Sequence, residues 1–155
     1  MPKLYIFALC EKAIIDKEGT ASLISLFNQI TAHLLPSAKE VPPNAIFPKE
    51  WCAFSSWKIE AEDIGKEYRE TFQLLYPNGE PFGPPMSVSF TPSADKTHQQ
   101  AFVMGTAFPI GQEGSYTLRM WLEHGGSVIF ESSPIIIKVN YEKMTELPPN
   151  VLTIP

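Results

Sequence analysis

The feature that most constrains this chain is an alternation of apolar and polar residues with a period of two. The alternation is clearest in residues 114–133, which read GSYTLRMWLEHGGSVIFESS and contain two alternating runs on either side of Gly125-Gly126. A period of two is the spacing of a β-strand that buries one face, and adjacent glycines tolerate the backbone angles of a tight hairpin turn. The segment therefore predicts an antiparallel β-hairpin.

Further segments carry the same signature of strands. WCAFSSWKIEA, from residue 51, has one apolar face and a second face that becomes polar toward its end, and YRETFQLLY, from residue 68, leads into the turn Pro77-Asn78-Gly79. MSVSFT at 86–91 and PIIIKVN at 134–140 predict two more strands. QQAFVMGTAF at 99–108 has apolar residues at both odd and even positions, which is typical of a strand packed on both sides or of an irregular edge.

The segment GTASLISLFNQI, residues 19–30, fits two structures. Its apolar residues fall at helical spacing, but a short apolar run after a glycine is equally typical of a buried strand. LYIFALC precedes it and several strands follow it, so we expect a strand from Leu23 to Ile30 that pairs with the first strand across the loop near 16–19.

Short strands with turn signals between them predict two β-sheets packed face to face. We expect an all-β antiparallel two-sheet sandwich of about 7–9 strands, immunoglobulin-like, with a jelly-roll as the alternative. Gly114-Ser115-Tyr116 favours the immunoglobulin-like version, because such sandwiches use a tyrosine at the start of the penultimate strand to bond back to the preceding corner. Trp57 would then be the core tryptophan of the third strand.

The chain length fits one domain. A chain of 155 residues buries enough surface for a core without disulfides or metals. We expect a single domain over residues 1–141 and a Pro-rich tail over 142–155 that packs on the domain or leaves it. The proline-rich connection 35–49 predicts a surface loop.

Charge and cysteine content narrow the classes of function. Twelve basic against 17 acidic residues give a net charge of −5, and only two of the basic residues are arginine, so nucleic-acid and anionic-membrane binding are not expected. Cys10 and Cys52 lie in no metal-binding or redox motif, and buried free thiols are favoured over a disulfide. The apolar run at 4–10 is too short for a signal peptide, and no run is long enough to span a membrane, which makes a cytoplasmic location the default.

The segments LYIFALCEK, GTASLISLFNQI, LLYPNGEP and GSYTLRMWLEHGG together resemble a bacterial family of uncharacterised small β-sandwich proteins. Members of that family begin with a strand that ends in cysteine and an acidic residue and continue into a Gly-x-x-Ser-Leu-Ile strand. The resemblance covers residues 3–140 and departs from the family pattern at Thr20, where lysine is commoner, and at Ser25, where glycine is expected. It implies a strand at Leu23 and no established activity.

No motif for catalysis, metal binding or cofactor binding is present in the sequence. The three histidines lie in separate contexts without a carboxylate at metal-ligand spacing, so surface positions are expected for them: His33, His98 and His124. The acidic residues at 60–63 read as a solvated strand end rather than as a catalytic pair. We therefore expect no enzyme, no metal and no cofactor.

The predicted hairpin offers the one candidate binding surface. A two-residue turn at Gly125-Gly126 pairs residues whose numbers have a constant sum. The pairs are Glu123 with Val128, Leu122 with Ile129, Trp121 with Phe130, Met120 with Glu131, and Arg119 with Ser132. The outer face then carries Arg119, Trp121, Val128 and Phe130, with the guanidinium able to contact the indole ring. Either the 36–48 loop or the tail covers this face, or the face is open to a partner.

These observations lead to a hypothesis about function. We expect a non-catalytic cytoplasmic module for protein interaction, whose partner is a second copy of the chain or another protein. A carbohydrate-binding sandwich is the alternative, because aromatic side chains often form platforms for sugar rings. A hydrolase with an unrecognised site comes third.

Overall fold

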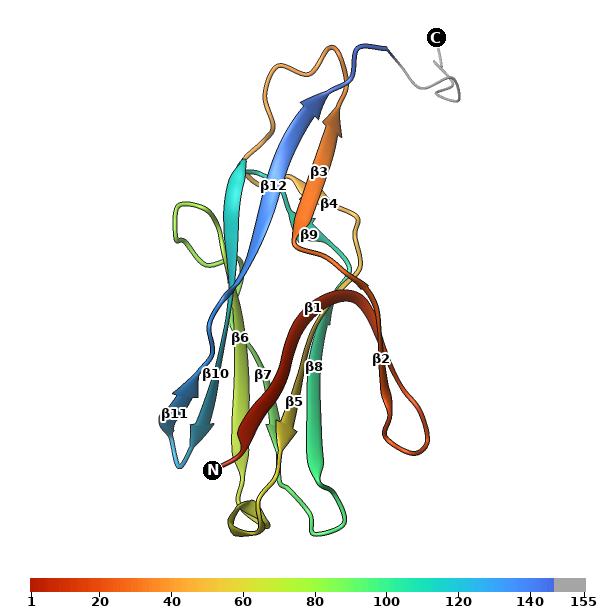
Figure 1. Cartoon of the computed structure of the whole chain (residues 1–155). Helices are drawn as coiled ribbons and strands as arrows, with labels where there is room; N and C mark the ends of the chain where they lie inside the picture. Colours follow the sequence, from red (N-terminus) through yellow and green to blue (C-terminus); the bar gives the residue numbers. More distant parts are fainter. Residues whose placement is uncertain (147–155) are drawn as a thin grey trace.

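A computed structural model of the chain describes residues 1–146 and is built almost entirely of β-strands (Figure 1). One short 3₁₀ helix, η1 (Ala61–Asp63), interrupts them. The strands are β1 (Lys3–Ile15), β2 (Ala21–Leu26), β3 (Gln29–Leu34), β4 (Ile46–Phe47), β5 (Trp51–Lys58), β6 (Tyr68–Leu75), β7 (Met86–Phe90), β8 (His98–Gly105), β9 (Phe108–Pro109), β10 (Gly114–His124), β11 (Ser127–Glu131) and β12 (Ile135–Lys143).

The strands form two large sheets that pack against each other. One sheet has the order β2-β1-β5-β8, and the other has the order β3-β12-β10-β6-β7 with β11 paired to β10. This division of strands is that of an immunoglobulin-like sandwich, so the predicted fold class is confirmed. The described residues contain twelve strands rather than 7–9, because β4 and β9 form a separate two-stranded ribbon and the segment 19–34 supplies two strands.

The ambiguous segment at 19–30 is extended, as predicted, but it is not one strand. β2 pairs antiparallel with β1, whereas β3 pairs with β12 in the opposite sheet, in the one parallel pairing among the described residues. The chain therefore changes sheets at residues 27–28. Just before this crossing, Ser25 has a φ of 54°, a left-handed conformation that costs a residue with a side chain roughly 1 kcal/mol.

The main core lies between the two sheets and is rich in large side chains. Its fully buried members come from both layers and include Trp57, Phe72, Tyr116, Leu118, Met120 and Ile137. Every residue from Trp51 to Trp57 is buried, so β5 is covered on both faces and not only on the one that its alternation predicted.

The tyrosine predicted to fix a corner does so. The hydroxyl of Tyr116 donates a hydrogen bond to the carbonyl oxygen of Gln112 at 2.9 Å and accepts one from the amide of the same residue. The expectation for Trp57 was wrong: it lies on β5, beside β1, and not on β6, the strand that pairs with β10 in the opposite sheet. Its indole is nevertheless buried at the centre of the core.

The predictions for the chain's cysteines and C-terminal region have different outcomes. Cys10 and Cys52 are free and buried, as expected, and face each other across β1 and β5. β12 extends two residues past the expected domain boundary at 141, and the tail positions 147–155 lie outside the described residues. Among residues 1–146 no helix is long and apolar enough to cross a membrane.

Candidate functional site

The β10–β11 hairpin turns at Gly125-Gly126, but its register differs from the predicted one beyond the first pairs. Glu123 pairs with Val128 as predicted, and then an irregularity in β11 places Phe130 opposite Leu122 and Glu131 opposite Trp121. The predicted pairings of Trp121 with Phe130, Leu122 with Ile129, Met120 with Glu131 and Arg119 with Ser132 were therefore wrong. The reason is one extra residue at the bulge, which reverses the faces of all residues after it.

Because of this bulge, Phe130 faces the core instead of the outer surface. Its ring meets the indole of Trp57 edge-on, with 5.5 Å between ring centroids. Phe130 also lines a groove of about 590 Å³ between the start of β1 and the start of β12, together with Phe7 and Ile135. Phe130 thus does not belong to one surface with Trp121.

The other three predicted surface residues, Arg119, Trp121 and Val128, remain on the outer face of the six-stranded sheet. The guanidinium of Arg119 lies 5.6 Å from the ring centre of Trp121, as predicted, and also donates to the Glu131 carboxylate at 2.6 and 3.0 Å. Trp121 is half-buried beside a shallow hollow of about 240 Å³, and Val128 is 56% exposed. The charge of Arg119 is therefore already satisfied within the chain.

A larger exposed apolar surface lies on the outer face of the four-stranded sheet. The register places Phe54 of β5 beside Ala8 of β1 and Phe102 of β8, and Cys52 beside Met104. Tyr5 is 68% exposed and Met104 66% exposed, although both are large apolar side chains. Their exposure is unexplained by the packing of the described residues.

The second half of β1 and β2 form a hairpin that covers part of this outer face, and Figure 1 shows β1 bending at its middle toward β2. Ala13, Ala21 and Leu23 of the hairpin pack on the small buried cluster around Cys52 and Phe54. The amide of Gln100 on β8 donates to the carbonyl oxygen of Gly19 at the hairpin's tip, at 2.9 Å.

Between this hairpin and β8 the structure leaves an open groove of about 450 Å³, which we call the outer groove. Apolar and polar side chains contribute to its walls in similar amounts. Those used below are Tyr5, Ile6, Leu23, Phe54, His98 and Gln100. The Tyr5 ring packs against the imidazole of His98, with 5.3 Å between centroids, so one rim of the groove is aromatic.

Glu70 is a carboxylate buried in the core between the sheets. One of its oxygens accepts a hydrogen bond from the hydroxyl of Ser55 at 2.8 Å, and the other has no partner among residues 1–146. Burial raises the pKa of Glu70 to about 7, against the lowering effect of the Ser55 hydroxyl, which itself accepts a hydrogen bond from the Trp57 indole at 3.2 Å. No basic side chain within residues 1–146 offsets this rise in the pKa. The stability of the fold therefore depends on the protonation of Glu70.

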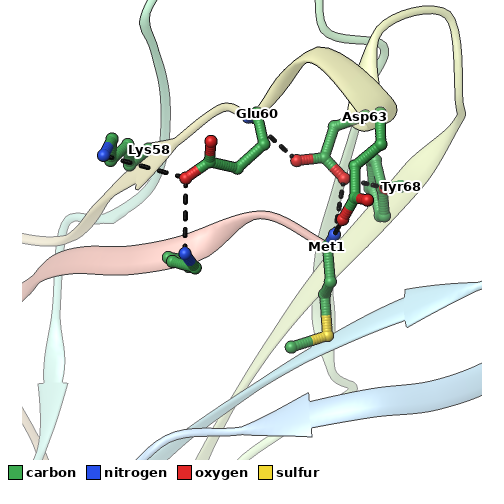
Figure 2. Close-up of polar contacts among 7 residues, drawn as sticks. Met1, Lys58, Glu60, Asp63 and Tyr68 are labelled. Atoms are coloured by element: carbon green, nitrogen blue, oxygen red, sulfur yellow. Dashed lines mark hydrogen bonds and ion pairs between the residues drawn. The ribbon is translucent and has the colours of Figure 1, made fainter.

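A second polar cluster lies where η1 follows β5, and Figure 2 shows how its side chains converge. Asp63 accepts hydrogen bonds from the Tyr68 hydroxyl at 2.8 Å and the backbone amide of Glu60 at 3.0 Å, and the amine of Met1 lies 2.9 Å from it. Burial tends to raise the pKa of Asp63, but these donors together lower it. The prediction of a solvated acidic end was wrong for Asp63, which is fully buried.

The three histidines are apart from one another. His124 donates from Nδ1 to the backbone carbonyl of Glu67 at 2.8 Å and packs on Tyr68, beside an open cavity of about 660 Å³ at the hairpin turn. His33 lies inside β3, is exposed as expected, and is 3.7 Å from the carboxylate of Glu142. No group of three metal-ligating side chains occurs within residues 1–146.

The outer groove and Glu70 were not found from the sequence. The groove depends on β1 curving over its own sheet, which no local pattern reveals. Glu70 did carry a signal: the period of two places it on the same face of its strand as Tyr68 and Phe72, two residues that are buried.

Comparisons with known proteins give a family and a distant structural similarity. A search of the curated proteins finds no match. One solved structure similar to this chain is a CARDB domain from Pyrococcus furiosus in complex with di-metal ions, with 13% sequence identity, a TM-score of 0.44 and coverage of 89% of this chain and 88% of that one. Residues 5–127 match DUF6941, a family of unknown function. The chain belongs to this family.

Proposed function

We propose that this chain is a non-catalytic protein-interaction module of a bacterial cytoplasmic protein and that it binds its partner in the outer groove. The observation that carries the proposal is the exposure of large apolar side chains around that groove, above all Tyr5. Proteins rarely leave contiguous apolar surface open unless it receives a ligand, a membrane or another protein.

The chemistry of the groove fits an apolar protein segment with polar flanks. Tyr5 and Ile6, which are 68% and 37% exposed, supply apolar contacts. Gln100 and His98 supply hydrogen-bonding groups at one wall. An apolar centre with a polar rim is the usual composition of a protein interface. Tyrosine is also among the residues that most often contribute a large share of binding energy.

The hairpin face of Arg119, Trp121 and Val128 is the competing surface. Binding a partner there would require the ion pair between Arg119 and Glu131 to be broken or buried, since both groups border the indole. Desolvating such a pair offsets much of the gain from burying the ring. In the outer groove the exposed aromatic residue, Tyr5, packs on the imidazole of His98 and not on an ion pair. The charged side chains of the groove lie elsewhere in its lining and are those of Glu18, Asp95 and Lys96.

The test compares substitutions of exposed residues on the two surfaces in the full chain. The partner is identified by affinity enrichment from extracts of the source cells, purified, and titrated calorimetrically against wild type, Tyr5→Ala and Val128→Ala. We expect Tyr5→Ala to weaken binding about tenfold and the matched control to change it less than twofold.

Equal affinities of wild type and Tyr5→Ala, or a larger loss with Val128→Ala, would contradict the proposed surface. A glycan panel read by tryptophan fluorescence is run in parallel. If a glycan binds and no purified protein does, the protein-interaction function is refuted and the carbohydrate alternative is favoured.

A further inference from the structure

Strand β8 forms one edge of the four-stranded sheet, and only one of its sides is paired among the described residues. Its register with β5 is continuous, from His98 opposite Lys58 to Gly105 opposite Trp51. Within residues 1–146 no other strand follows β8 in the sheet order. One row of its backbone hydrogen-bonding groups therefore faces away from the sheet.

The hydrogen bonds of the sheet determine which residues carry that free row. The amide of Ile59 donates to the carbonyl oxygen of Thr97 at 2.9 Å, in the same register. In antiparallel strands inward-bonded and outward-facing residues alternate, so the odd-numbered residues of β8 bond to β5 and the even-numbered ones face outward. The side chain of Gln99 accordingly donates to the carbonyl oxygen of Gln100, at 3.1 Å, which is one of these outward groups. The outward-facing residues are His98, Gln100, Phe102 and Met104.

β8 also lacks the features that protect other edge strands. It contains no proline, no lysine and no acidic residue, and its pairing with β5 has no bulge. By contrast, edge strand β7 is shorter and begins directly after Pro84-Pro85, and β2 is distorted by the positive φ of Ser25. An uncharged edge without a proline or a bulge is a template for another strand.

We propose that β8 pairs with β8 of a second copy of this chain, antiparallel, about a two-fold axis at Ala101. In this register His98 pairs with Met104 and Gln100 with Phe102 of the other copy, so every outward-facing residue finds a partner inside the strand. Moving the axis to Phe102 would pair His98 with a residue beyond the end of β8. Four residues in each copy then exchange about eight hydrogen bonds, two of which replace the bonds from the Gln99 side chains to the Gln100 carbonyl oxygens.

The composition of the strand favours a second copy as its occupant. A self-paired β8 brings no like charges together, because none of its residues is acidic or carries a permanent positive charge. Phe102 and Met104, which are 38% and 66% exposed, gain neighbours on the outer face. Ala101, at the axis, is small enough for the close approach of a non-hydrogen-bonded pair.

This pairing has a consequence for binding. The axis of an antiparallel pair is perpendicular to the sheet, so the outer faces of both copies lie on the same side of one continuous sheet. If the outer groove binds a partner, as proposed above, the dimer presents two grooves to a bivalent target. The pairing of β8 itself does not depend on that function.

The first test traps the two-fold axis with a disulfide. In Ala101→Cys the two new thiols face each other in a non-hydrogen-bonded pair, whereas in the control Val103→Cys each new thiol faces Gln99 of the other copy. Mild oxidation with oxidised glutathione is followed on a non-reducing gel. We expect a linked dimer, twice the 17.3 kDa of the chain, for Ala101→Cys only. No linked species, or equal linking of both variants, overturns the proposal.

The second test measures the mass of the particle in solution by light scattering over a concentration series. We expect a dimer for wild type and at least a tenfold larger dissociation constant for Phe102→Pro, which removes an outward amide and no bond to β5. Phe102→Ala, which keeps the amide, should lie between the two. If wild type is a monomer at every concentration, the proposal is overturned. That result does not bear on partner binding by Tyr5, which the calorimetric titrations test.

Discussion

The buried carboxylate of Glu70 makes the stability of this fold depend on pH. Its pKa rises from 4.5 to about 7 because the side chain lies in the core without a compensating cation. Between these values the folded chain holds a proton that the unfolded chain has released, so the free energy of unfolding falls as the pH rises. The stability is fully present below about pH 4.5 and the loss is complete above about pH 7.

The size of the effect follows from the displacement of the pKa. Each pKa unit corresponds to about 1.4 kcal/mol, so the change from 4.5 to about 7 costs the folded chain about 3 kcal/mol at alkaline pH. Glu70→Gln replaces the carboxylate with a neutral group of the same shape. The difference in the free energy of unfolding between the variant and wild type should therefore change by about 3 kcal/mol in favour of the variant as the pH rises from 4.5 to 8. The difference at low pH only sets the starting value.

Urea unfolding of both proteins, followed by tryptophan fluorescence at several pH values, measures this difference. Glu131→Gln is the matched control, because the Glu131 side chain is 48% exposed. It should shift stability by the small amount typical of a surface ion pair. A difference between Glu70→Gln and wild type that stays constant from pH 4.5 to 8 would refute the assignment of Glu70 as a buried, proton-binding group.

Three further predictions concern single sites. Ser25→Gly should stabilise the fold by about 1 kcal/mol in urea unfolding, because it relieves a side chain held at a φ of 54°, and a destabilised variant would count against that conformation. Gly111→Ala should destabilise it by about 2 kcal/mol or more, since the new Cβ would lie 1.9 Å from the carbonyl oxygen of Pro43, and unchanged stability would show that the loops do not meet there. Burial raises the pKa of Cys52 to about 12 and also raises that of Cys10, so both thiols should react with Ellman's reagent at pH 8 only as the chain unfolds, and rapid labelling of the native chain would contradict their burial.

The sequence predicted those parts of the fold that depend on local pattern. Period-two alternation identified the strands, and the Gly-x-Tyr pattern identified the hydrogen bond of Tyr116 to Gln112. Gly125-Gly126 correctly predicted the hairpin turn. Both glycines have the positive φ that such a turn requires.

Features that depend on one extra residue or on distant packing were not predictable. The bulge in β11 turns the side chain of Phe130 from the outer face to the core, and no residue type at the bulge indicates it. The curvature of β1, which creates the outer groove, accompanies the packing of Leu23 on Cys10, Cys52 and Phe54, a contact among β2, β1 and β5. For these two reasons the candidate site lies on the four-stranded sheet and not on the hairpin, where the sequence predicted it.

The free edge of β8, which borders the outer groove, is the structural basis for the proposed pairing of two copies. Residue-specific amide exchange by NMR on a dilute sample of the full chain tests it most directly. We expect amides of residues 99, 101 and 103 to be protected by β5 and those of residues 100, 102 and 104 to exchange at least tenfold faster. Uniform protection along 98–105 at every dilution, or the opposite alternation, would show that the outward row of β8 is not free in this chain.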